Sequence, residues 1–172
     1  MREHIDRYRQ WWKAGLPFIL VTITAVRRSA PLPPGQTMAI GPQDGATVQD
    51  VSDLDVVGSV SGGCVESDIL HRPRDMLVNG NSCEEALFGF SEDTAFAYGL
   101  TCGGELEVLL ERIDAAHFPH FGVALDEISA GRAVTLASVV SEDGRSEQTV
   151  RTSIGGDITG SPWLRVALSV LD

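Results

Sequence analysis

The stretch Gly58-Ser-Val-Ser-Gly-Gly-Cys-Val-Glu66 places a cysteine directly after two glycines, and Leu100-Thr-Cys-Gly-Gly104 places another directly before two. Glycine adopts positive φ values that other residues avoid, and it lets a ligand come close to the backbone. A thiol held beside such backbone suits sulfur or metal-cofactor chemistry. We therefore expect these two segments to form one site.

Composition limits the classes of function. The chain has 172 residues, of which 43% are hydrophobic, and this is enough for one domain with its own core. The net charge of −11 disfavours a nucleic-acid binder, which normally displays a basic surface. No run of about 18 apolar residues and no apolar signal core is present, so we expect a cytoplasmic protein without membrane association. Three cysteines without CxxC or HxxxH spacing predict neither a disulfide framework nor a metal site.

The first glycine pair separates an expected strand from an expected helix. The helix is predicted to begin at Gly62 or Gly63, with Ser61 as its N-cap. Cys64 then lies in the first turn, where unpaired amides and the helix dipole favour anions and lower the pKa of a thiol. Glu66 lies in the same turn, either near a ligand or simply as a helix-stabilising carboxylate.

Hydrophobic periodicity predicts an α/β fold in which helices flank a mixed β-sheet. Strands are expected at residues 18–27, 37–40, 56–60, 86–90, 105–112, 133–140 and 148–152, and helices at residues 3–14, 62–79, 117–130 and from about 162. The order strand, turn, strand, glycine pair, helix recurs around Gly155-Gly156, which indicates a weak internal repeat without the thiol. We interpret Trp11 and Trp12 as packing residues.

Several polar residues remain between these elements. Arg27 and Arg28 end the first strand, and they suit either capture of an anion or a solvated strand end. His71 and Cys83 have no supporting spacing, so we assign them structural or surface roles. Pro73 is expected to kink or restart, after His71, the helix that follows the first motif.

The two cysteine motifs, with Ser29-Ala-Pro-Leu-Pro-Pro-Gly35 and Ser91-Glu-Asp93, resemble the XdhC/CoxI family, accessory proteins of molybdenum hydroxylases such as xanthine dehydrogenase. The resemblance divides the chain into a cysteine-motif region at residues 1–112 and a middle region at residues 113–172 that packs on it. The Rossmann-like C-terminal domain of most members has no counterpart in this sequence. Leu32 stands where members usually have a basic residue, and Thr37 where they often do.

The resemblance implies a molybdenum-cofactor chaperone rather than an enzyme. Such a protein binds the cofactor as cargo, supports its sulfuration with a cysteine desulfurase, and delivers it to the apo-hydroxylase; the family-like fold also implies a homodimer. The residues that would contact the cargo are the thiols of Cys64 and Cys102, the cradle glycines Gly62, Gly63, Gly103 and Gly104, and the nearby Ser61, Glu66, Arg27 and Arg28.

Two other functions stay open. Cys64 and Cys102 could form a reversible disulfide in a sulfur-transfer or redox enzyme, although no histidine or lysine motif supplies a base. Alternatively, both cysteines are small core residues of an interaction domain. A Cα separation above about 7 Å would exclude the disulfide, and sealed apolar surroundings would favour the interaction domain.

Overall fold

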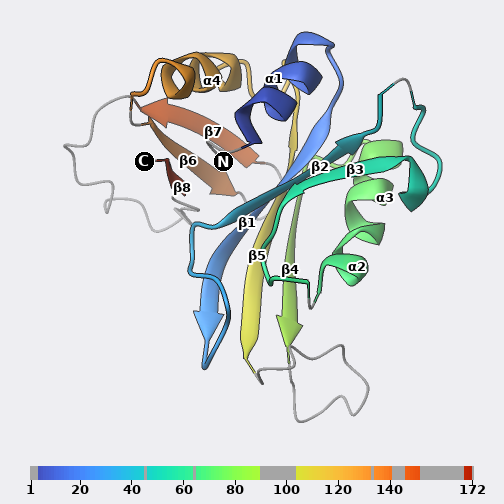
Figure 1. Ribbon diagram of the computed structural model, residues 1–172, viewed down its shortest axis with the longest axis vertical. Helices are drawn as coiled ribbons and strands as arrows, with labels where there is room; N and C mark the ends of the chain where they lie inside the picture. The colour runs from blue at the N-terminus through green and yellow to red at the C-terminus, as the bar shows by residue number, and fades with distance from the viewer. Residues whose placement is uncertain are drawn as a thin grey trace.

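The computed structural model describes residues 4–44, 46–63, 65–89, 104–132, 134–140, 146–151 and 169–171 (Figure 1). Its centre is a five-stranded sheet with the strand order β3-β2-β1-β5-β4, accompanied by a three-stranded sheet with the order β7-β6-β8. Every strand pairing in these ranges is antiparallel. The α/β class with helices around a sheet is confirmed, but the predicted mixed sheet is wrong, because all described strand pairs of both sheets are antiparallel.

The elements have the following bounds. The larger sheet contains β1 (Phe18–Arg27), β2 (Thr37–Pro42), β3 (Leu54–Gly58), β4 (Cys83–Gly89) and β5 (Glu105–Ile113). The smaller sheet contains β6 (Val134–Val140), β7 (Ser146–Arg151) and β8 (Ser169–Leu171). The helices are α1 (Ile5–Lys13), α2 (Glu66–Ile69), α3 (His71–Asn79) and α4 (Phe121–Ser129), and a short 3-10 turn covers Val51–Asp53.

The central strand β1 is buried on both faces. Because successive side chains of a strand point to opposite faces, Ile19 and Val21 enter one core cluster while Phe18 and Leu20 enter another. We call the first the α3-side core, because α2 and α3 cover it, and the second the α4-side core, where α1, α4 and β6 contribute. In Figure 1 these two sets of elements lie on opposite sides of the larger sheet.

Trp11 fixes α1 to the sheet. Its side chain is fully buried, its Nε1 donates a hydrogen bond to the carbonyl of Pro42 at 2.8 Å, and its ring stacks on Phe18 at 5.2 Å. Gly41 makes this contact possible, because a Cβ there would stand 2.7 Å from Cε2 of Trp11. Trp12 is half-buried against Phe121. The interpretation of both tryptophans as packing residues is therefore confirmed.

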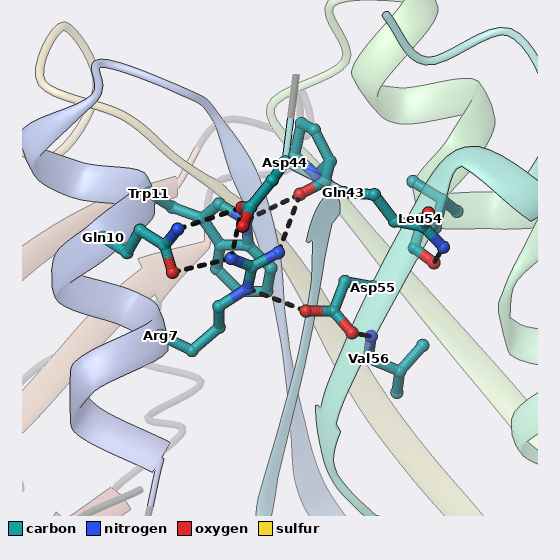
Figure 2. A network of polar contacts seen from close by, with 9 residues as sticks. Arg7, Gln10, Trp11, Gln43, Asp44, Leu54, Asp55 and Val56 are labelled. Carbon is teal, nitrogen blue, oxygen red and sulfur yellow. Dashed lines mark hydrogen bonds and ion pairs between the residues drawn. The ribbon is translucent and has the colours of Figure 1, made fainter. Parts of the chain in front are cut away.

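An arginine on α1 reinforces the same junction (Figure 2). The guanidinium of Arg7 forms ion pairs with Asp44 at 2.6 Å and with Asp55 on β3 at 2.7 Å. It also donates a hydrogen bond to the carbonyl of Pro42 at 3.3 Å and lies 4.9 Å from the centre of the Trp11 ring. Since the Arg7 side chain is largely buried, these carboxylates compensate a charge that burial alone would destabilise.

The segment after β3 differs most from the prediction. The helix begins at Glu66, with Val65 as its N-cap, instead of at the glycine pair. It ends at Ile69, and α3 then begins at His71 and carries Pro73 in its first turn, where the missing amide proton of proline is tolerated. The predicted interruption of the helix is confirmed, but it falls at Leu70, before His71 instead of after it. The expected repeat around Gly155-Gly156 and the start of the helix expected from about residue 162 lie outside the described residues, and Ser169–Leu171 form strand β8 where that helix would continue.

The described helices of this fold include no candidate for a membrane span. In the ranges given above, no helix combines the length and the apolar character needed to cross a bilayer.

Matched substitutions of Trp11 and Trp12 test how α1 is held against the sheet. We expect Trp11→Phe to lower the free energy of unfolding by about 2 kcal/mol, because it removes the buried hydrogen bond to Pro42 and leaves a void. The same change at half-buried Trp12 should lower it by less than about 1 kcal/mol. Urea unfolding of both variants measures the difference, and an equal or larger loss for Trp12→Phe would contradict this account of the junction.

Candidate functional site

The carboxylate of Glu66 orders the loop that joins β3 to α2. Among the described residues, its oxygens accept hydrogen bonds from backbone amides and serine hydroxyls of this loop. Oε1 accepts from Oγ of Ser59 at 2.5 Å, from the amide of Ser61 at 2.9 Å and from the amide of Val60 at 3.3 Å. Oε2 accepts from Oγ of Ser61 and from the amide of Gly63 at 2.9 Å. The amide of Val65 donates to Oγ of Ser61 at 2.9 Å and, at the longer distance of 3.2 Å, to Oε2.

These donors keep Glu66 ionised. Partial burial by itself raises the pKa of the carboxyl, but the hydrogen bonds from Ser59 and Ser61 outweigh it and lower the pKa to about 2. Glu66 therefore carries its negative charge throughout the physiological pH range. Ser59 was not among the predicted site residues, although a serine two positions before Ser61 and upstream of an acid was a signal for this contact.

The loop has a buried base and an exposed tip. Val60, Ser61 and Val65 are buried, whereas Gly62 and Gly63 are exposed. The two glycines have φ values of 71° and 108°, and a Cβ on either would contact nothing within 4 Å. The requirement for glycine here is therefore the backbone conformation, as predicted, and the space around the tip is open.

The predicted anion site on a helix N-terminus is wrong for these amides. Ser61 is not the N-cap of α2, and the amides of Val60, Ser61, Gly63 and Val65 all donate to Glu66. The amide of Gly62 donates to Oγ of Ser59 at 2.8 Å. The protein thus supplies its own anion to this loop, and the Glu66 carboxylate is engaged with backbone instead of facing a ligand. Cys64 lies outside the described residues.

The second cysteine motif enters β5 through a crowded corner. A Cβ on Gly104 would overlap the carbonyl oxygen of Ser29 and stand 3.3 Å from that of Arg27. A Cβ on Gly89, at the end of β4, would stand 2.6 Å from the carbonyl oxygen of Gly104. Gly104 is therefore required by the close approach of the Arg27–Ser29 backbone, and Gly89 by the close approach of Gly104. Cys102 and Gly103 lie outside the described residues.

The two predicted anion-binding arginines differ in their surroundings. Arg27 forms ion pairs with Glu107 at 2.8 Å and with Glu105 at 3.9 Å, so carboxylates of the protein already neutralise its charge. Arg28 is exposed, has a left-handed φ of 64°, and forms no hydrogen bond or ion pair with another described residue. Of this pair, Arg28 is the better candidate for an anionic ligand.

The remaining positions have structural roles or surface locations. Leu32 packs against the α3-side core and Thr37 is buried, so neither position supplies an anion contact. Cys83 is half-buried on β4, opposite Glu111 in the register, and His71 is exposed at the start of α3. In the described part of the chain, no three His, Cys, Asp or Glu side chains are grouped as a metal site would need.

The topology directs the end of β3 and the start of β5, which adjoin the two motifs in the sequence, toward the same end of the larger sheet. β3 and β1 run in the same direction, so the Glu66 loop leaves β3 toward the end where β1 reaches Arg27. Arg27 pairs there with Glu105, the first residue of β5. The distance between the two thiols is outside the described residues, and a single site formed by both motifs stays a prediction.

The β1–β4 part of this fold, with the Glu66 loop at its edge, has known relatives. Residues 11–87 match the XdhC and CoxI family. The XdhC and CoxI match contains the whole first cysteine motif and ends before the second. It confirms the resemblance inferred from the sequence.

A solved structure, described as a xanthine dehydrogenase from Bacillus halodurans, is similar to 92% of this chain with a TM-score of 0.65 and 24% identity. This likeness shows a shared fold. The chain covers 46% of that protein, so it spans about half of its length. Comparison with curated proteins gave no match.

Acid unfolding tests the Glu66 interactions. Because the pKa of Glu66 is lower in the folded chain than its ordinary value of 4.5, its ionised form stabilises the fold above about pH 4.5. That contribution to stability is lost as the pH falls from about 4.5 to about 2. We expect Glu66→Gln to be less stable than the wild type at pH 7, with a difference that shrinks toward pH 2. Urea midpoints across this range measure it, and a difference independent of pH would contradict the assignment.

The corner at Gly104 gives a second prediction. Gly104→Ala should lower the free energy of unfolding by about 3 kcal/mol, because the new methyl group must displace the Ser29 carbonyl. Gly62→Ala should lower the free energy of unfolding by about 1 kcal/mol, since only the left-handed backbone conformation at this position disfavours alanine. Chemical denaturation of the two variants compares them. A Gly104→Ala protein as stable as the wild type would show that the corner is not tightly packed.

Proposed function

We propose that this chain is an accessory factor in the maturation of a xanthine dehydrogenase-type molybdenum hydroxylase. It acts in the cytoplasm as a chaperone that holds molybdenum cofactor as cargo, helps its sulfuration and delivers it to the apo-enzyme. The observation that carries this proposal is the XdhC and CoxI match at residues 11–87, which includes the first cysteine motif.

The geometry of the Glu66 loop supports a role in holding cargo. The exposed Gly62 and Gly63 have open space around them, which allows a flat ligand such as a pterin to approach the backbone. Cys64 follows them directly in the chain. A thiolate is a soft ligand that suits molybdenum, and it can also accept or donate sulfur as a persulfide. Cys102 is proposed as the second thiol.

The loop amides are not available to the cofactor phosphate, because they already donate to Glu66. The phosphate therefore needs a cationic side chain outside this loop. We assign this contact to Arg28, which is exposed and next to the corner formed by Gly104. A local positive group matters here because the net charge of −11 repels an anionic ligand at long range.

The proposed partners follow from this role. They are the apo-hydroxylase that receives the cofactor, a cysteine desulfurase that supplies sulfur, and a second copy of the chain in a homodimer. Analytical ultracentrifugation of the protein with each candidate partner would measure these associations directly.

Binding of released molybdopterin tests the proposal. We expect the wild type to retain the cofactor during gel filtration, and Cys64→Ser, Cys102→Ser and Arg28→Ala each to weaken binding about tenfold, equivalent to about 1.4 kcal/mol. Cys83→Ser is the matched control, because it makes the same change on β4, away from both glycine-cysteine motifs, and should bind as the wild type does.

Two results would contradict this function. One is the absence of cofactor binding by the wild type under conditions in which a longer XdhC protein binds it. The other is equal binding by all of the cysteine variants, which would remove the role assigned to Cys64 and Cys102. The longer protein is a necessary comparison because this chain spans about half of its structural neighbour.

A further inference from the structure

β3 is an edge strand of the larger sheet, and the hydrogen bonds beside it show which of its backbone groups point outward. It pairs with β2 on one side, and no other described strand pairs with it. The carbonyl of Asp53, just before β3, accepts a hydrogen bond from the amide of Gln43 at 2.9 Å and so faces β2. Because backbone groups of successive strand residues point to opposite sides, Asp55 and Val57 also face β2. The residues whose amides and carbonyls point outward are therefore Leu54, Val56 and Gly58.

Each of these three outward positions is unsuited to pairing with another strand. The amide of Val56 donates a hydrogen bond to Oδ1 of Asp55 at 3.0 Å (Figure 2). The carbonyl of Leu54 accepts one from Nε2 of Gln43 at 3.2 Å. Gly58 has a φ of 82°, outside the extended region, so a regular ladder cannot continue past Val56. Without such features, an exposed edge is a template for pairing with another chain, and the side chain at Val56 is 37% exposed.

Arg7 holds the Asp55 carboxylate in this position. Its Nε forms an ion pair with Oδ2 of Asp55 at 2.7 Å, so the two carboxylate oxygens have different partners. The guanidinium is itself held by the carbonyl of Pro42 and lies over the ring of Trp11, and the Arg7 side chain is only 16% exposed. Since ion pairs near the surface contribute little to stability, the main effect of this contact is on the orientation of Asp55.

We propose that the Arg7–Asp55 ion pair closes the β3 edge against pairing with the same edge of a second copy of this chain. A second copy is the relevant partner, because a two-fold antiparallel pairing centred on Val56 exchanges two backbone hydrogen bonds. Asp55 prevents this exchange, since it already accepts the hydrogen bond of the Val56 amide. Any homodimer of the protein then uses another surface.

Sedimentation velocity of Asp55→Ala tests this closure. The substitution frees the Val56 amide and removes the carboxylate that Arg7 contacts on β3. We expect the association constant between copies to rise about tenfold above that of the wild type, because pairing at Val56 gains backbone hydrogen bonds. An association constant equal to that of the wild type would overturn the proposal.

Asp44→Ala is the matched control. Asp44 is the other carboxylate paired with Arg7, at 2.6 Å, and it also accepts a hydrogen bond from Nε2 of Gln10 at 2.9 Å. Neither contact involves β3, so its loss should leave the association constant at the wild-type value. A rise as large as that in Asp55→Ala would overturn the proposal, because weakening of the α1 junction would then be sufficient to cause association.

Val56→Pro, added to Asp55→Ala, tests whether the association uses this edge. Proline has no amide proton, and it is tolerated on an edge strand where the lost amide points outward. The double variant should therefore keep its pairing with β2 while its association returns to the wild-type level. Association that persists in the double variant would overturn the proposal, because it would have to use a different surface.

Amide hydrogen exchange decides the question even if the proline variant fails to fold. In Asp55→Ala, the Val56 amide should exchange more slowly as the protein concentration rises, because pairing between copies protects it. In Asp44→Ala, exchange of the same amide should not depend on concentration. A concentration-independent rate in Asp55→Ala would overturn the proposal. None of these measurements uses molybdenum cofactor, so a failure of the proposed function is distinguishable from a failure of this inference.

Discussion

A strand that is apolar on both faces must be covered on both faces, and β1 imposes this constraint on the rest of the chain. Val21 requires α2 and α3 on one side, while Leu20 requires α1, α4 and β6 on the other. Each large side chain buried in this way contributes about 1.5–3 kcal/mol. A hydrogen bond from Ser138 on β6 to Glu111 on β5, at 3.0 Å, adds a polar link between the two sheets.

The loop after β3 is where the α3-side cover joins the sheet. Val60 and Val65 bury its two ends in the core. In the turn between them, the amides of Ser61 and Gly63 point toward the same position. An unpaired buried amide costs about 1–3 kcal/mol, so this conformation needs an acceptor. Glu66 provides it from within the chain. The conformation of the glycine tip is therefore held by hydrogen bonds within the chain.

Local sequence patterns determined many of the strands and helix ends of this protein. The ten-residue strand at residues 18–27 and the strand at residues 105–112 were readable because alternation and β-branched residues are local signals. The glycines after α1, α3 and α4 ended helices where expected. The interruption of the helix ahead of Pro73 followed from the missing amide donor of proline. The cysteine motifs, together with residues 29–35 and 91–93, indicated the family that residues 11–87 match.

Tertiary structure decided which polar groups meet. The sequence predicted that Ser61 caps a helix and that the amides at its N-terminus bind an anion. In the fold, the Glu66 carboxylate accepts hydrogen bonds from these amides, and α2 begins four residues after Gly62. Arg27 was an equal candidate to Arg28 until pairing of β1 with β5 brought Glu107, 80 positions away, against it. Secondary structure follows from neighbours in the chain, but a donor binds whichever acceptor the packed elements bring within about 3 Å, and that choice is made only in three dimensions.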